Sequence, residues 1–184
     1  DIYVASLDCF RCYAHENSFD RYVKAAADEL AQEAGALLSI NGDYCNAQGN
    51  DGFYVRNGVI YQTRQTSCDL CVLYGDGTME TYGKKDYKVD DVIERDPIHV
   101  WKFGPRLLTE DGKAKTEFNA PGAIWIGNPR SAIGYYEPGH YCFVMVDGRQ
   151  KNWSRGLTLK QLSQLFEDLG CTAAYNLDGG ASAT

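Results

Sequence analysis

The sequence has no apolar run approaching the ~20 residues that a membrane-spanning helix needs. It also has no excess of positive charge: 18 lysine and arginine residues stand against 25 aspartate and glutamate residues, a net charge of −7. Nonspecific binding to nucleic acid or to an anionic membrane surface requires a basic face, so this balance argues against both partners. A small basic pocket within an acidic protein stays compatible with it.

Internal repeats and linker-like low-complexity stretches are absent as well. With 44% hydrophobic and 23% charged residues, we expect a single folded domain over residues 1–184. The sequence opens directly into the strand-like run Ile2-Tyr3-Val4-Ala5 and ends just after a glycine-rich turn. We therefore expect an excerpt, cut at both ends, of a longer chain.

Helix signals occur in three places. Ser18 caps a predicted helix over residues 18–34 that Gly35 ends, and Thr158 caps one over residues 159–169 that Gly170 ends. Residues 89–94 read as a short acidic helix.

Strand signals dominate the rest of the chain. Two hairpins are predicted at Asn57-Gly58 and at Gly75-Asp76-Gly77. Further strands are expected at residues 36–40, 100–103, 106–108, 141–146 and 173–177. The predicted fold class is mixed α/β (α+β), a layered mixed β-sheet with hairpins and at least two packed helices.

Acidic and glycine-rich residues follow two of these predicted strands. In Asn176-Leu177-Asp178-Gly179-Gly180, two glycines allow a sharp turn whose amides can hold an anion while Asp178 does acid–base or nucleophilic work. An ordinary Asp-Gly turn explains the pattern about as well. Asn41-Gly42-Asp43-Tyr44 has the same layout, and two such carboxylates suit glycoside hydrolysis. A capped turn is again the plain alternative.

Arg130, in Asn128-Pro129-Arg130-Ser131, offers a planar fork to two phosphate oxygens, although a structural arginine is the commoner case. Trp153 and Tyr44 are candidates for stacking on a sugar. Asp147 follows a strand too, but Asp147-Gly148-Arg149 reads as a simple turn.

The seven cysteines cannot all pair within the chain. The pairs Cys9/Cys12 and Cys68/Cys71 are weak candidates for a zinc site, because positions i and i+3 of a strand point to opposite faces. Disulfides or buried thiols are at least as good an explanation. The sequence specifies no cofactor and leaves a divalent metal open.

Four blocks resemble the phosphodiester glycosidase family, in a bacterial-type form. They are Asn41-Gly42-Asp43-Tyr44; the run from Asp51-Gly52-Phe53 to Gly58; Asn128-Pro129-Arg130-Ser131-Ala132-Ile133-Gly134; and the run from Val146-Asp147-Gly148-Arg149 to Asn176-Leu177-Asp178-Gly179-Gly180. Ala181 stands where the family often has a third glycine, and the cysteine pairs are not a general family feature.

The resemblance implies hydrolysis of a sugar-1-phosphodiester, with N-acetylglucosamine as a candidate sugar. It also implies a sugar-phosphate or glycan of the cell wall as substrate and an extracellular or cell-envelope location. We then expect Asp178, Asp43 and Arg130 to be catalytic; the substrate-binding set would be Asn41, Gly42, Asn176, Gly179, Gly180 and Ser182. The alternatives are a noncatalytic carbohydrate or cell-wall binding module and a zinc-stapled interaction domain. The sequence does not indicate the oligomeric state.

Overall fold

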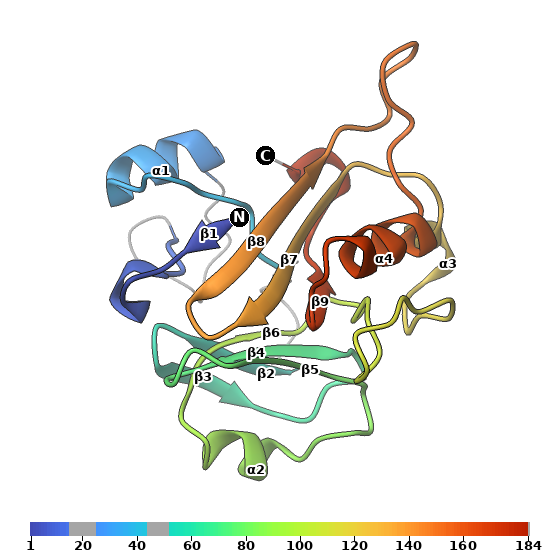
Figure 1. The fold of residues 1–184 in the computed structure, drawn as a ribbon. Helices are drawn as coiled ribbons and strands as arrows, with labels where there is room; N and C mark the ends of the chain where they lie inside the picture. Colours follow the sequence, from blue (N-terminus) through green and yellow to red (C-terminus); the bar gives the residue numbers. More distant parts are fainter. Residues whose placement is uncertain (15–24, 44–51, 184) are drawn as a thin grey trace.

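Two antiparallel sheets form the body of the protein (Figure 1). The computed structural model describes residues 1–14, 25–43 and 52–183. The four-stranded sheet has the order β1 (Ile2–Tyr3), β8 (His140–Val146), β7 (Arg130–Glu137) and β9 (Ala173–Asn176). The five-stranded sheet has the order β3 (Val59–Thr63), β2 (Phe53–Arg56), β6 (Pro97–Trp101), β4 (Leu70–Tyr74) and β5 (Met79–Tyr82).

The helix bounds are α1 Ala27–Ala34, α2 Val89–Ile93, α3 Gly122–Trp125 and α4 Leu159–Asp168, with single 3₁₀ turns at Leu7–Cys9 and Gly180–Ser182. Helix α4 packs on the four-stranded sheet and α2 on the five-stranded sheet, while α1 lies beyond the β1 edge (Figure 1). α4 begins in a capping box, because Thr158 accepts from the Gln161 amide while the Gln161 side chain accepts from the Thr158 amide. None of the helices in the described ranges is long and apolar enough to cross a membrane.

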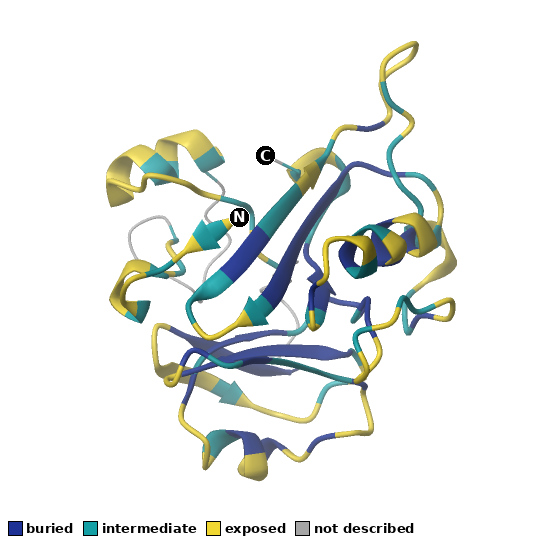
Figure 2. Cartoon of the chain, viewed as in Figure 1, coloured by how far each residue is buried: buried dark blue, intermediate teal, exposed yellow. Residues whose placement is uncertain are grey.

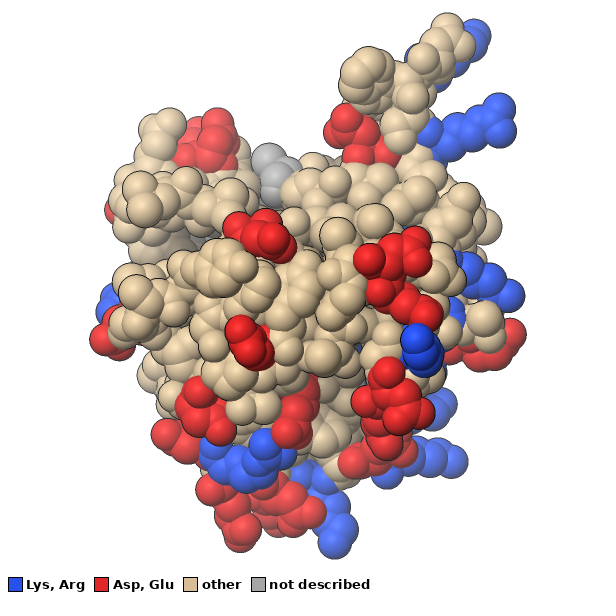
Figure 3. All heavy atoms as spheres, in the orientation of Figure 1, with Lys and Arg blue, Asp and Glu red and all other residues tan. Residues whose placement is uncertain are grey.

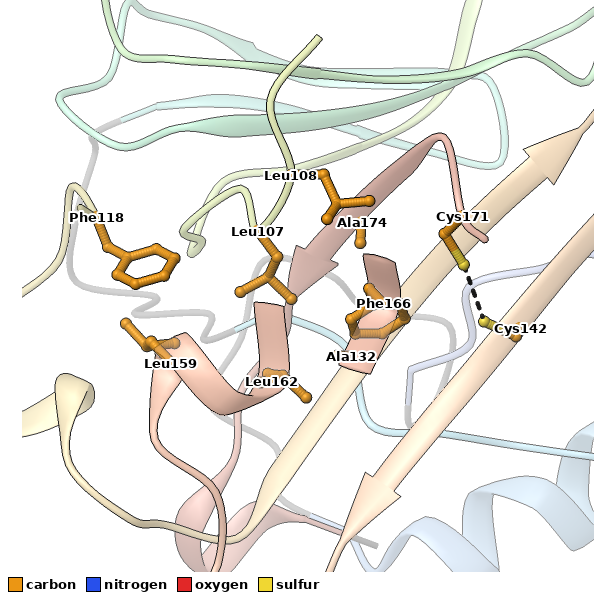
Figure 4. Packing of buried hydrophobic residues seen from close by; sticks show 10 residues of the cluster. All are labelled: Leu107, Leu108, Phe118, Ala132, Cys142, Leu159, Leu162, Phe166, Cys171 and Ala174. Atoms are coloured by element: carbon orange, nitrogen blue, oxygen red, sulfur yellow. Dashed lines mark hydrogen bonds between the residues drawn. The ribbon is translucent and has the colours of Figure 1, made fainter. Parts of the chain in front are cut away.

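The core consists of three layers of buried side chains. Buried residues are concentrated in the strands of both sheets and on one side of α4 (Figure 2). The central layer joins the two sheets through residues such as Leu73, Trp101, Ile133 and Tyr175. The second lies between the four-stranded sheet and α4 (Figure 4), and the third lies between the five-stranded sheet and α2. Strands β7 and β9 of the four-stranded sheet are therefore mostly buried, whereas β1 and the end of β8 are partly exposed.

The α+β class, both hairpins and the helices at 89–94 and 159–169 are confirmed. Asn57 and Gly58 have φ of 50° and 76°, as their hairpin turn requires. Gly35 ends α1 in the left-handed conformation, with φ of 62°.

Other predicted elements differ. α1 begins only at Ala27, and Ser18 lies outside the described residues. Residues 36–40 form no strand: Leu37 and Leu38 are 106% and 60% exposed, because no neighbouring strand pairs with this apolar run. In residues 103–108 only isolated bridges form, at Arg106 and Leu108, beside a cis Gly104–Pro105 bond. Strand β7 is a central strand of the four-stranded sheet. The sequence pattern does not predict it, because its first residues, Arg130 and Ser131, are polar.

Candidate active site

Three segments far apart in the sequence meet at one end of the four-stranded sheet. The Asp178 amide donates to the Gly42 carbonyl over 2.9 Å, and the Gly180 amide donates to the Pro129 carbonyl over 3.0 Å. Asn41 is held on both sides, since its Nδ2 donates to the Asp178 carbonyl and its Oδ1 accepts from the Ser131 hydroxyl. The structure thus brings the 41–43, 128–131 and 176–182 segments together.

The Gly179-Gly180 turn fits only glycine at its first position. A Cβ on Gly179 would lie 2.6 Å from the Pro129 carbonyl oxygen, well inside contact distance. Gly180 has φ of 67°, in the left-handed region that favours glycine. The predicted role of these amides in holding an anion is not supported, because the Gly180 amide already donates to Pro129 and the Gly179 amide to the Asp178 carboxylate.

Asp178 is half-buried at this turn. Burial raises the pKa of its carboxyl above the usual value, hydrogen bonds from Ser182 and from the Gly179 amide lower it, and the negative charge of Asp43 adds to the rise. The net direction is upward. A carboxylate of this kind takes up a proton more readily than an exposed one, which suits acid–base or nucleophilic work.

Asp43 lies near Asp178 but in a different environment. It forms a buried ion pair with Arg56, whose side chain, like that of Asp43, is 5% exposed. Its second oxygen accepts from the Lys102 amide over 3.0 Å. Both oxygens have partners within the fold, so this geometry favours a structural role for Asp43 over the predicted catalytic one.

Arg130 also has its partners within the fold. Its guanidinium is buried and donates to three carbonyl oxygens: Nε to Leu157 over 2.9 Å, and Nη2 to Ile124 and Ile126 over 2.6 and 2.7 Å. Burial and the nearby Arg149 lower its pKa to about 10. Adjacent side chains of a strand point to opposite faces, so Ser131 reaches Asn41 while Arg130 points away from it. In this arrangement Nε and Nη2 of Arg130 are engaged by backbone carbonyls, and its role at a phosphate stays a prediction.

Arg149 is the cation that the sequence pattern missed. Its Nε and Nη2 donate to Asn128 Oδ1 over 3.2 and 2.8 Å, and its guanidinium would contact a Cβ on Gly180 at 3.2 Å. Arg149 has φ of 55°, a conformation that the pattern Asp-Gly-Arg does not reveal. It is exposed at the base of an arm of residues 147–157 that projects from the body (Figure 1), and basic side chains lie along this arm (Figure 3).

The remaining predicted residues divide between site and scaffold. Asn176 is 1% exposed, and its Nδ2 donates to the Gly104 and Leu177 carbonyls, so it anchors the Gly104–Pro105 turn and is not placed to contact a substrate. Its Oδ1 is buried without a hydrogen-bond partner among the described residues. Ser182 is exposed beside Asp178. Tyr44 lies outside the described residues.

The zinc candidates do not form a site. Within the described ranges, no group of three or more histidine, cysteine or acidic residues is arranged to hold a metal ion. Cys9 is exposed, Cys12 and Cys68 are half-buried, and Cys71 is buried in the layer between the sheets. Cys9 ends the 3₁₀ turn Leu7–Cys9, and of the four cysteines only Cys71 lies in a strand, β4, so the expected strand pairs do not form.

Residues 34–184 match the model of the phosphodiester glycosidase family. The chain belongs to this family. All three segments that meet at the sheet end lie within the matched region. The phosphodiester glycosidase match thus covers Asp178, Arg149 and the residues that hold them.

Individual proteins are similar to the chain in sequence or in fold. The chain is 28% identical over 159 residues to the SPbeta prophage-derived uncharacterized protein YomE of Bacillus subtilis (strain 168), covering 84% of this chain and 24% of that protein. It is similar in fold, with a TM-score of 0.71 and 23% identity, to the catalytic domain of zebrafish N-acetylglucosamine-1-phosphodiester alpha-N-acetylglucosaminidase, auto-inhibited by its pro-peptide.

That match covers 88% of this chain and 57% of the zebrafish chain. A hypothetical protein from Synechocystis shares the fold with a TM-score of 0.55 and 14% identity, over 87% of this chain and 49% of the other. The chain thus spans about a quarter of the length of the curated relative and about half that of the two solved structures.

Proposed function

We propose that this chain hydrolyses the bond between a sugar's anomeric carbon and a phosphodiester. The observation that carries the proposal is that the Gly179-Gly180 turn adjoins both a half-buried carboxylate, Asp178, and the guanidinium of the exposed Arg149. A sugar-1-phosphodiester needs both groups: an anion partner for the phosphate and a carboxylate for the oxocarbenium-like anomeric centre.

In this reaction the bond from the anomeric carbon to the phosphate oxygen breaks, and its electron pair leaves with the phosphate. Water supplies the hydroxyl of the freed sugar, and its second proton balances the phosphomonoester that departs. Phosphate is a good leaving group, so protonating it matters less than stabilising its charge. Arg149 provides the positive charge that stabilises the departing phosphate. Asp178 attacks the anomeric carbon or activates the water. Asn41 holds the Asp178 segment, and Ser182 orients its carboxylate.

The test uses a p-nitrophenyl ester of N-acetylglucosamine 1-phosphate in an assay coupled to a phosphatase. Cleavage at the anomeric carbon releases p-nitrophenyl phosphate, so colour develops only when the phosphatase is present. We expect Asp178→Asn and Arg149→Ala each to lower kcat/KM by about 10²–10³-fold, because each removes a transition-state contact.

Lys151→Ala is the matched control for Arg149→Ala, since it removes an exposed positive charge from the same arm. Full activity in both folded variants, Asp178→Asn and Arg149→Ala, would refute the site. Colour without phosphatase would mean that the phosphate–nitrophenol bond breaks instead. Retention of a glycan without release of sugar would favour the noncatalytic carbohydrate-binding module.

The substrate class and location belong to the same proposal. A sugar phosphate of a cell wall or cell envelope, with N-acetylglucosamine as the first sugar to test, fits the family and the exposed Trp153 on the arm, which is 76% exposed and can stack on a sugar face. An extracellular or cell-envelope location follows from such a substrate.

A further inference from the structure

The structure has a pocket of about 240 Å³. It is lined by Asp69, Gly83, Lys84, Lys85, Asp86, Arg106, Lys115 and Asn119. None of these residues belongs to the segments that carry Asp178 and Arg149. Four of the lining side chains are basic and two are acidic, in a protein whose net charge is −7.

A buried carboxylate assembles this pocket. Asp69 is 3% exposed and accepts hydrogen bonds from the Lys84 amide (3.3 Å), the Arg106 amide (3.1 Å) and Asn119 Nδ2 (3.2 Å). These partners come from three separate segments, so Asp69 fixes the walls of the pocket relative to one another. The hydrogen-bond donors to the Asp69 carboxylate are all amide groups. The ammonium of Lys84 and the guanidinium of Arg106 therefore form no hydrogen bond with it.

The floor of the pocket is also closely fitted. Arg106 Nη2 pairs with Asp86 Oδ2 over 3.1 Å directly above Gly83. A Cβ on Gly83 would lie 2.5 Å from that Asp86 oxygen and 3.1 Å from Arg106 Nη2. The Asp86–Arg106 ion pair therefore occupies the space that a side chain at residue 83 would take.

The three lysines of the pocket form no ion pair with any carboxylate of the described residues. Across the described residues, no carboxylate lies within 4.0 Å of the ammonium groups of Lys84, Lys85 or Lys115. Lys113 is the contrast, because it pairs with Glu167 over 3.2 Å. Like charges gathered on the walls of one pocket repel each other, and an anion that enters relieves that repulsion.

We propose that this pocket binds a phosphate group, carried either by a small phosphate ester or by a longer anionic glycan. Ammonium and guanidinium groups are donors only, so the ligand must offer several acceptors and negative charge, as phosphate does. The volume admits a phosphate with a small attached group. This site is built from residues other than those of the hydrolytic site, and its role is to bind.

The experiment follows backbone amide signals by NMR while sodium pyrophosphate is titrated into the ¹⁵N-labelled protein at low salt. We expect saturable shifts of the Lys84, Arg106 and Asn119 amides, and weaker binding as salt is raised. The double variant Lys84→Gln/Lys115→Gln should weaken binding about tenfold or more at these amides. Lys88→Gln/Lys160→Gln removes the same charge elsewhere on the surface and should leave binding unchanged.

The amides of Gly179 and Gly180 report phosphate at the hydrolytic site separately, so the two proposals can fail independently. Shifts at those glycines without shifts around the pocket would overturn this inference, as would equal weakening by both double variants. A glycerol phosphate oligomer forms the second arm. Tighter binding of the oligomer than of pyrophosphate would assign a polymeric source for the phosphate, and the reverse would assign a small ester.

Discussion

Asp43 and Asp178 show how the environment of a residue decides its role. Each aspartate stands two residues after an asparagine and next to a glycine in the sequence. The two motifs therefore suit catalysis equally. In the structure Asp43 is neutralised by the buried Arg56, whereas Asp178 has no ion-pair partner among the described residues. Catalysis needs a group whose charge is not already engaged, so Asp178 is the stronger assignment.

The Asp43–Arg56 pair gives a stability prediction. Asp43→Asn leaves the Arg56 charge buried without its partner, and we expect a loss of about 3–5 kcal/mol in the free energy of unfolding, measured in urea. Arg95→Gln, which breaks a largely exposed pair with Glu80, is the control and should cost much less. Equal losses in the two variants would contradict the reading of Asp43 as a buried structural charge.

His99 gives a prediction about pH. It is 1% exposed; Nδ1 accepts from the Asn57 amide over 3.3 Å, and Nε2 lies 3.1 Å from the Phe10 carbonyl oxygen. Burial lowers its pKa to about 4, and the charge of Arg56 adds to this effect. The unfolded chain binds the proton near pH 6.5, so the stabilising effect is full above pH 6.5 and is lost as pH falls towards 4.

We therefore expect the free energy of unfolding to fall by roughly 1 kcal/mol per pH unit between pH 6 and 5 because of His99. Urea denaturation at a series of pH values measures this slope. His99→Gln should remove that contribution, while His140→Gln should retain it. A slope that is the same in His99→Gln and the parent protein would rule out His99 as its source.

At the scale of elements, strand β7 packs tightly against helix α4 in the core layer between the four-stranded sheet and α4. A Cβ on Gly134 of β7 would lie 2.7 Å from Cys142 Sγ and from Phe166 Cε1, and 2.8 Å from Cys171 Sγ. The two sulfur atoms themselves are 3.7 Å apart (Figure 4). Glycine is required here for packing, which explains a small residue in the middle of a strand.

Gly134→Ala should accordingly destabilise the protein by about 1–3 kcal/mol through overpacking, measured as a lower urea midpoint. Gly122→Ala is the matched control, because a Cβ at Gly122 meets no atom within 4 Å. If both alanines were tolerated equally, α4 would not be seated on β7 as closely as described.

At the scale of the whole molecule, two tyrosine hydroxyls join the sheets. Tyr175 of β9 donates to the Asp69 carbonyl over 2.6 Å, and Tyr141 of β8 donates to the Gly77 carbonyl over 2.7 Å. Both side chains are fully buried. The sheet that carries the candidate active site is thus fixed to the sheet whose loops line the basic pocket.

Tyr175→Phe keeps the packing and removes the hydroxyl, leaving the Asp69 carbonyl without this donor. We expect a loss of about 1–3 kcal/mol in unfolding free energy, measured in urea. Tyr3→Phe, at a side chain that is 74% exposed, should be near neutral. A neutral result for Tyr175→Phe would show that the contact between the sheets is apolar alone.

Local signals in the sequence determined the hairpin at Asn57-Gly58, the limits of α4 between Thr158 and Gly170, and the motifs that mark the family. Each of these features depends on residues close in sequence. Their local conformational preferences do not require contacts with distant segments. Tertiary structure alone decided that Leu37 and Leu38 lie exposed, that Arg130 and Asp43 are engaged by partners within the fold, and that Arg149 reaches Gly180. Such outcomes depend on which atoms from distant segments meet and form hydrogen bonds, ion pairs and contacts with one another. A short run of neighbouring residues does not contain that information.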